Sequence, residues 1–186
     1  CEATDRREVC LGFRDFHDTY SRHGWGRSIT KEEALEILEQ SQKEGLVLQP
    51  SNEQEPQFIC ACCSCCCGVL EMMSVMPRPA DFAATNYYAA LDTDLCNGCG
   101  KCAKACQMDA ITIKDKKAIL EVGRCIGCGL CVPGCKTDAI RLEKKATEVL
   151  PPKTTEDLYE TIMQNRKTSF EKYLSVAGAL LKGKKR

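Results

Sequence analysis

Two runs of four cysteines carry the chemistry that this sequence most clearly predicts. In each run two residues separate the first three cysteines from one another, and three residues precede the fourth. Thiolates are soft ligands, and four of them at this spacing wrap a loop around an iron–sulfur cluster. The run occurs twice, so we expect two [4Fe–4S] clusters and the transfer of single electrons. The first run is Cys96, Cys99, Cys102 and Cys106, and the second is Cys125, Cys128, Cys131 and Cys135.

An internal repeat surrounds the two runs. Residues 94–113 align with residues 123–142 at an offset of 29, and Asp-Ala-Ile follows the fourth cysteine in both halves. Each half is therefore expected to form a cluster loop, a short helical turn and the start of a strand. We expect one strand at Ala110–Ile113, a return strand at Ala118–Val122, and a hairpin turn at Asp115–Lys117.

The region from Cys96 to Cys135 resembles the bacterial dicluster ferredoxin. The resemblance implies that each cluster takes three cysteines from one run and the fourth from the other. It also implies an α+β, ferredoxin-like domain with two pseudo-symmetric cluster loops, here flanked by N-terminal and C-terminal helices. The implied ligands are Cys96, Cys99, Cys102 and Cys135 for cluster I, and Cys125, Cys128, Cys131 and Cys106 for cluster II.

The sequence departs from that family at the residue after each fourth cysteine. The family usually has proline there, whereas this chain has Gln107 and Lys136. Each replacement leaves a free N–H group and a longer side chain beside a cluster.

A second cysteine-rich segment, CACCSCCC, contains Cys60, Cys62, Cys63, Cys65, Cys66 and Cys67. Neighbouring side chains point apart, so one metal site cannot use all six without a sharp turn. A subset such as Cys60, Cys63 and Cys66 or Cys67 could converge, with Cys10 or Cys1 as a distant partner. Three interpretations stay open: a third iron–sulfur cluster, a zinc site, or free and redox-reactive thiols.

The order of segments along the whole chain resembles a group of anaerobe ferredoxin-domain proteins that carry this CxCCxCCC segment. The resembling parts are the Cys10-Leu-Gly-Phe stretch, the stretch from Gly26 to Leu35, the cysteine-rich segment and the dicluster region. Larger members of the group have further N-terminal sequence, and the present chain, which begins with Cys1, is expected to be a processed or partial product.

Helical patterns flank the cysteine-rich parts. Thr30 and Glu33 form a capping box that begins a helix, and Gly45 is suited to end it. Thr155 is expected to cap a helix carrying Leu158 and Ile162, and a further helix is expected over 170–181, before the basic tail 182–186. We therefore divide the chain into a helical, cysteine-rich region 1–90, a 2[4Fe–4S] ferredoxin domain 91–145 and a helical extension 146–186.

Composition narrows the class of function. Lys+Arg and Asp+Glu each number 26, which gives no charge excess for nucleic acid, and no stretch is apolar enough to span a membrane. The 16 cysteines stand at metal-binding rather than disulfide spacings, which fits the reducing cytoplasm of an anaerobe. No GxGxxG, P-loop or catalytic triad pattern is present.

We therefore expect an electron carrier or electron-transfer subunit, docked to a partner oxidoreductase or assembled as a homo- or hetero-oligomer. The alternative is a redox enzyme in which the Cys60–Cys67 segment builds the active cluster and the ferredoxin domain supplies its electrons.

Overall fold

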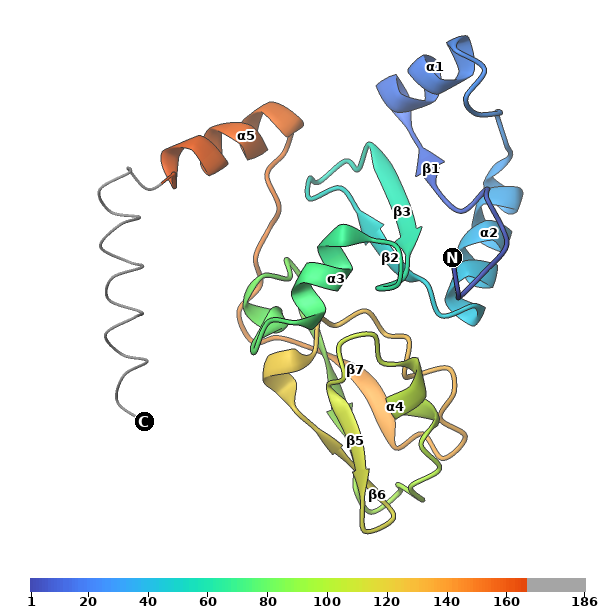
Figure 1. Cartoon of the computed structure of the whole chain (residues 1–186). Coiled ribbons are helices and arrows are strands. Elements are labelled where there is room, and N and C mark those ends of the chain that lie inside the picture. Colours follow the sequence, from blue (N-terminus) through green and yellow to red (C-terminus); the bar gives the residue numbers. More distant parts are fainter. Residues whose placement is uncertain (167–186) are drawn as a thin grey trace. The chain divides into compact units, whose positions relative to one another are not determined.

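A computed structural model describes residues 1–166 of the chain (Figure 1). The helix expected over 170–181 and the basic tail lie outside these residues. The described chain divides into two compact units, one of Cys1–Ser51 with Pro56–Leu150, and one of Asn52–Glu55 with the described residues from Pro151 onward. None of the helices formed by residues 1–166 combines the length and apolar content needed to cross a membrane.

The first unit mixes helices and strands, which confirms the expected α+β character. Its elements in chain order are β1 (Leu11–Gly12), α1 (Arg14–Arg22), α2 (Lys31–Lys43), β2 (Val47–Pro50), β3 (Phe58–Cys62), α3 (Gly68–Ser74), η1 (Pro79–Asp81), β4 (Tyr87–Leu91), α4 (Lys101–Ala105), β5 (Ile111–Lys114), β6 (Lys117–Leu120), η2 (Val122–Arg124) and β7 (Ile140–Lys144).

The N-terminal region contains a three-stranded antiparallel sheet that the sequence analysis did not predict. In this sheet β3 lies between β1 and β2 (Figure 1). Strand β3 carries two of the clustered cysteines, Cys60 and Cys62, at alternate positions. Ala61, which points to the opposite face, packs in a small core with Leu46 and Cys63.

Two strand pairs support the dicluster region. Strands β5 and β6 form the expected hairpin, with Lys114 opposite Lys117 and only Asp115 and Lys116 between them. Both turn residues have positive φ, of 50° and 57°, as a two-residue turn between twisted strands requires. Strand β4 pairs with β7 from Tyr87–Lys144 to Leu91–Ile140. Strand β4 was not among the strands predicted from the sequence.

The repeat therefore extends further upstream than residue 94. Gly98 has φ of +70°, and a Cβ built on it would lie 2.3 Å from the carbonyl oxygen of Lys116. Gly127 has φ of +68°, and its Cβ would lie 2.3 Å from the carbonyl oxygen of Tyr87. Tyr87 and Lys116 are separated by the same 29 residues as the two glycines. In both halves, glycine lets a cluster loop approach the backbone of a supporting strand or its turn.

We expect the Gly127→Ala variant to lose more than about 2 kcal/mol of unfolding free energy. A left-handed conformation costs alanine ~1–2 kcal/mol, and the contact with Tyr87 adds a backbone displacement. Gly134→Ala is the matched control, since Gly134 lacks a positive φ and its nearest contact would be 3.7 Å. Denaturant unfolding of the iron-loaded proteins measures the difference, and equal midpoints for the two variants would contradict it.

The two halves differ where the first contains α4. The first run encloses Ala103-Lys-Ala between its last two cysteines, and these residues form a helix. The second run encloses Val132-Pro-Gly at the same place, where the chain forms turns. Proline and glycine are the poorest helix formers, which explains why the helical turn expected in both halves is present in only one.

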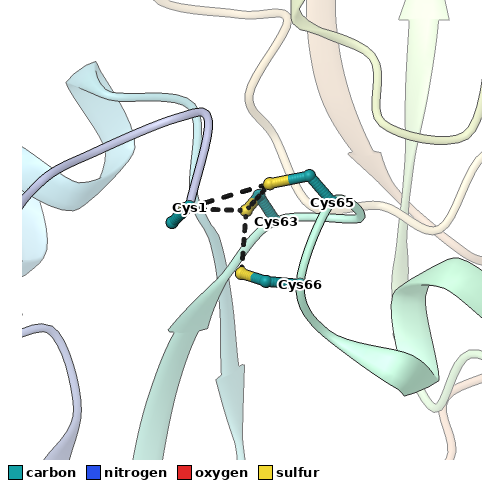
Figure 2. A group of neighbouring side chains, drawn as sticks. All are labelled: Cys1, Cys63, Cys65 and Cys66. Atoms are coloured by element: carbon teal, nitrogen blue, oxygen red, sulfur yellow. Dashed lines mark hydrogen bonds between the residues drawn. The ribbon is translucent and has the colours of Figure 1, made fainter.

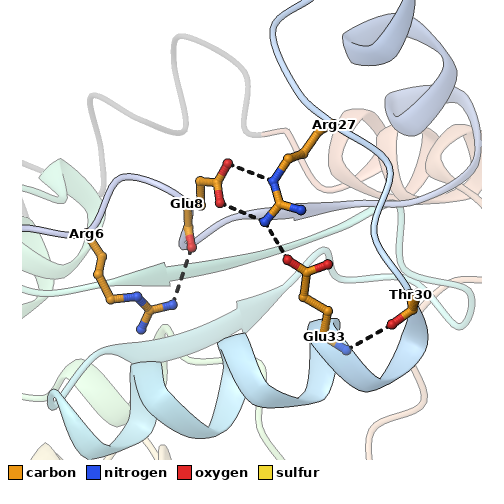
Figure 3. Close-up of polar contacts among 5 residues, drawn as sticks. All are labelled: Arg6, Glu8, Arg27, Thr30 and Glu33. Carbon is orange, nitrogen blue, oxygen red and sulfur yellow. Dashed lines mark hydrogen bonds and ion pairs between the residues drawn. The ribbon is translucent and has the colours of Figure 1, made fainter.

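The expected N-cap of helix α2 is present, but only one of the two hydrogen bonds of the expected capping box forms. The Thr30 hydroxyl accepts a hydrogen bond from the Glu33 amide at 3.2 Å. The Glu33 carboxylate does not return to Thr30 and instead pairs with Arg27, whose guanidinium also binds both carboxylate oxygens of Glu8 (Figure 3). This ion-pair group ties the segment between Cys1 and Cys10 to the start of α2. Gly45 has φ of +81° and ends the helix as expected.

The second unit contains α5 (Thr155–Gln164). The cap is Thr154 rather than the predicted Thr155, because Thr154 and Asp157 form the reciprocal capping box. The Thr155 hydroxyl instead donates a hydrogen bond to the carboxylate of Glu53 at 2.7 Å.

Candidate metal centres

The four cysteines expected to hold cluster I line one small cavity. Cys96, Cys99 and Cys102 come from the first loop and α4, and Cys135 comes from the second run. Glycine and aliphatic side chains form much of the remaining wall, together with Asn97 and Lys101. Burial raises the pKa of Cys102, whereas the Thr137 hydroxyl lowers the pKa of Cys135.

The four cysteines expected to hold cluster II line a second cavity, and again one of them comes from the other run. Cys125, Cys128 and Cys131 lie in the second loop, and Cys106 follows α4. Burial, followed by the neighbouring thiols of Cys128, Cys125 and Cys106, raises the pKa of Cys131 to about 12. The structure thus brings the crossed sets of sequence-predicted residues together, and their ligand roles stay a prediction.

Backbone amides point at the cysteine sulfurs of both cavities. The Ala118 amide donates to Cys96 Sγ at 3.4 Å, and the Ala89 amide donates to Cys125 Sγ at 3.3 Å. The two donors, Ala89 and Ala118, are 29 residues apart, and so are the two acceptors, Cys96 and Cys125. Strands β6 and β4 therefore donate to equivalent cysteines of the two halves. Such N–H···S bonds stabilise negative charge on sulfur and therefore influence the reduction potential of a bound cluster.

Two side chains next to cluster II cysteines connect the dicluster region to the N-terminal cysteine-rich segment. Gln107 accepts a hydrogen bond from the Ser64 amide and donates one to the Gly45 carbonyl, both at 2.6 Å. Arg124 donates to the carbonyls of Met108, Met76 and Ser74 at 2.7–2.9 Å, and so holds the end of α3. In the sequence, Gln107 is notable only as a replacement for proline.

Part of the second cysteine-rich segment forms a compact group with Cys1. The sulfurs of Cys1, Cys63, Cys65 and Cys66 all lie within 4.8 Å of one another, and Figure 2 shows them converging. Cys63 is buried, whereas the other three are exposed. We call these four residues the compact quartet. The combination of Cys60 with Cys63 that the sequence analysis named as an example does not occur in it.

The other cysteines outside the dicluster region lie on the opposite side of β3. Cys10 directly precedes β1, whose Leu11 pairs with Ile59 of β3, and Cys10 and Cys60 line one cavity. Cys62 and Cys67 pack against a common hydrophobic cluster. Burial and then the thiols of Cys67, Cys60 and Cys10 raise the pKa of Cys62 to about 12. We call Cys10, Cys60, Cys62 and Cys67 the wide quartet.

Comparison with known proteins gives one family. The family described as 4Fe-4S dicluster domain matches residues 89–147, a range that begins within β4 and ends beyond β7. Among curated proteins, none matches the chain. The match includes both cavities, all eight of their cysteines and most of the paired strands that support them. Residues 89–147 of this chain therefore match the 4Fe–4S dicluster domain, which implies bound iron–sulfur clusters.

Proposed function

We propose that this protein transfers single electrons, with one [4Fe–4S] cluster held at each of the two four-cysteine cavities. The observation that carries the proposal is the composition of each cavity: three cysteines from one run meet the fourth from the other. The donor set fits a cubane cluster, because four thiolates can each bind one iron corner. When bound, such clusters supply reversible one-electron oxidation and reduction.

The chain's own residues give the two sites different access to water and to partner proteins. Cys99 of the first cavity is exposed, whereas none of the four cysteines of the second cavity is. Electron exchange with a redox partner is therefore expected on the side of Cys99. Leu130 and Ile111 line the second cavity and exclude water from it. The elements that flank the dicluster domain supply further surface for a partner oxidoreductase or a second copy of the chain.

A reductive titration tests this function. The full chain, purified without oxygen, is expected to take up at least two electrons per chain and to pass them to a one-electron acceptor such as cytochrome c. Cys99→Ser and Cys128→Ser should each take up one electron fewer, because each removes a ligand from a different cavity. Electron uptake that is absent, or that neither variant changes, would contradict the proposal.

A second candidate function is a redox enzyme, and one observation favours it. A cavity of about 420 Å³ opens at Cys10 and Cys60 and is lined by aromatic residues that include Phe16, Tyr20 and Trp25. This is the size of a small-molecule site, ~300–1,000 Å³. Reduction of a disulfide there would consume two electrons and two protons and release two thiols. Catalytic reduction of a small disulfide by the reduced protein, stopped by Cys60→Ser, would support it, and no turnover would exclude it.

A further inference from the structure

The eight cysteines outside the dicluster domain divide between the two faces of β3. Side chains of a strand alternate between its faces, so Cys60 and Cys62 lie on one side. Cys63, the next residue, continues the alternation and packs with Ala61 and Leu46 on the other side. Because the side chains of β3 alternate between its faces, the cysteines of this segment cannot all bind at one metal site. Four of the eight thiols lie on each side of β3.

The compact quartet has the dimensions of a site for one metal ion. Four sulfurs at ~2.3 Å from a tetrahedral Zn²⁺ stand about 3.8 Å from one another. The Cys63 sulfur lies 2.8 Å from that of Cys65, 3.4 Å from Cys66 and 3.3 Å from Cys1, and Cys1 lies 3.9 Å from Cys65. A cubane would spread the sulfurs further, because each thiolate then binds a different iron.

The dicluster cysteines provide an internal comparison. Within residues 1–166, no other group of three or more His, Cys, Asp or Glu ligand atoms is as closely spaced as the compact quartet. The cysteines of both dicluster cavities therefore stand further apart than those of the compact quartet. The difference is the one expected between cubane sites and a mononuclear site in the same molecule.

We propose that Cys1, Cys63, Cys65 and Cys66 bind a single Zn²⁺ ion. Four thiolates in a tetrahedral arrangement suit zinc, which binds more tightly than Fe²⁺ to the same ligands, and they leave no open position for a substrate. The site is structural: it fastens the N-terminal segment to the loop after β3. The ion pairs of Glu8 with Arg27 and of Arg6 with Glu44 hold the intervening segment beside α2.

Metal analysis of the full chain, produced with both iron and zinc and purified without oxygen, tests this site. We expect one zinc per chain in the wild type and none in the Cys65→Ser/Cys66→Ser double variant. Both cysteines are exposed, so the variant should fold and keep the iron of the dicluster domain. Ser64→Ala is the matched control, because it changes the same loop without removing a thiol, and it should keep its zinc.

Cobalt gives a second measurement, since Co²⁺ bound by four thiolates in a tetrahedron absorbs strongly in the visible range. The wild type should show this absorption after zinc is replaced, and the double variant should not. A wild type without zinc, an iron ion in its place, or a double variant that keeps its zinc would each overturn the proposal. A double variant that loses iron together with zinc would also overturn it.

An independent observation concerns the wide quartet. Cys62 and Cys67 pack against the same hydrophobic cluster as Cys106 and Cys128, two cysteines of the second dicluster cavity. Within the part of the chain that the structure describes, the sulfurs of the wide quartet, like those of the dicluster cysteines, do not gather as closely as those of the compact quartet. We infer that Cys10, Cys60, Cys62 and Cys67 bind a third iron–sulfur cluster, which lies next to the second cavity. This inference rests on the proposed electron-transfer function and extends it by one site.

Iron content separates the third cluster from the first two. We expect about 12 iron atoms per chain in the wild type and about 8 in Cys62→Ser, because each cubane holds four. Cys65→Ser is the matched control in the same segment and should keep all the iron. About 8 iron atoms in both the wild type and Cys62→Ser would overturn the third cluster alone. In that case, if Cys128→Ser held four iron atoms fewer than the wild type, the result would still support the dicluster function.

Discussion

We expect Cys106→Ser to lose the same cluster as Cys128→Ser, although the sequence places Cys106 in the run with Cys99. The structure brings Cys106 to the second cavity with Cys128, and Cys99 lines the first cavity. Serine is a poor ligand for iron at this position, so each single variant should lose about four iron atoms. Electron paramagnetic resonance of the reduced proteins should show the same cluster missing from both variants.

Double variants make the test quantitative. Cys106→Ser/Cys128→Ser should lose no more iron than either single variant, because both residues serve one site. Cys106→Ser/Cys99→Ser should lose about eight iron atoms, because the residues serve different sites. The reverse pattern would mean that each run holds its own cluster, and it would overturn the crossed assignment. The exposed Cys99 also permits its variant to fold, which keeps the comparison valid.

Features that depend on short stretches of sequence could be predicted well. The cysteine runs, the hairpin turn at Asp115 and Lys116, the Thr30 cap and the helix end at Gly45 each depend on residues close together in the chain. The internal repeat predicted that the two halves of the dicluster region have equivalent cluster loops. The crossed grouping came from the resemblance, and the cavities agree with it, because each is lined by three cysteines of one run and the fourth cysteine of the other.

Features that depend on distant pairing were missed. Strand β4 pairs with β7, which follows it by about fifty residues, and local patterns do not report such partners. One signal was present: extending the repeat upstream aligns Ala89 with Ala118 and Leu91 with a second leucine, Leu120. The cysteines of the Cys60–Cys67 segment could not be assigned to two groups without the bounds of β3. Cys60 and Cys62 lie on one face of this strand, and Cys63, which follows its last residue, packs with Ala61 on the other face.

Gln107 shows how a departure from a family pattern acquires a role from tertiary structure. In the sequence it is only the residue that replaces proline after Cys106. In the structure its amide group joins the Ser64 amide of the cysteine-rich loop to the Gly45 carbonyl at the end of α2. Proline could make neither bond. The side chain thus couples the loop of the compact quartet to the second dicluster cavity.

We expect Gln107→Ala to weaken the attachment of this loop by about 2–4 kcal/mol. The substitution removes two hydrogen bonds and leaves a partly buried N–H and a carbonyl without their partner, and each of these effects costs about 1 kcal/mol or more. Amide hydrogen exchange at Ser64 is the measurement. Its rate should rise roughly 30- to 700-fold, since each 1.4 kcal/mol is a factor of about ten.

Two further variants show whether the two hydrogen bonds of Gln107, the Gln107 bridge, cause the slow exchange at Ser64. Gln107→Glu keeps an oxygen for the Ser64 amide but loses the donor to Gly45, so exchange at Ser64 should rise less than in Gln107→Ala. Gln42→Ala changes an exposed glutamine on α2 and should leave exchange unchanged. If Ser64 exchanges at the wild-type rate in Gln107→Ala, the bridge contributes nothing to the attachment. The attachment would then come from α3, whose end Arg124 holds, and from the shared hydrophobic cluster.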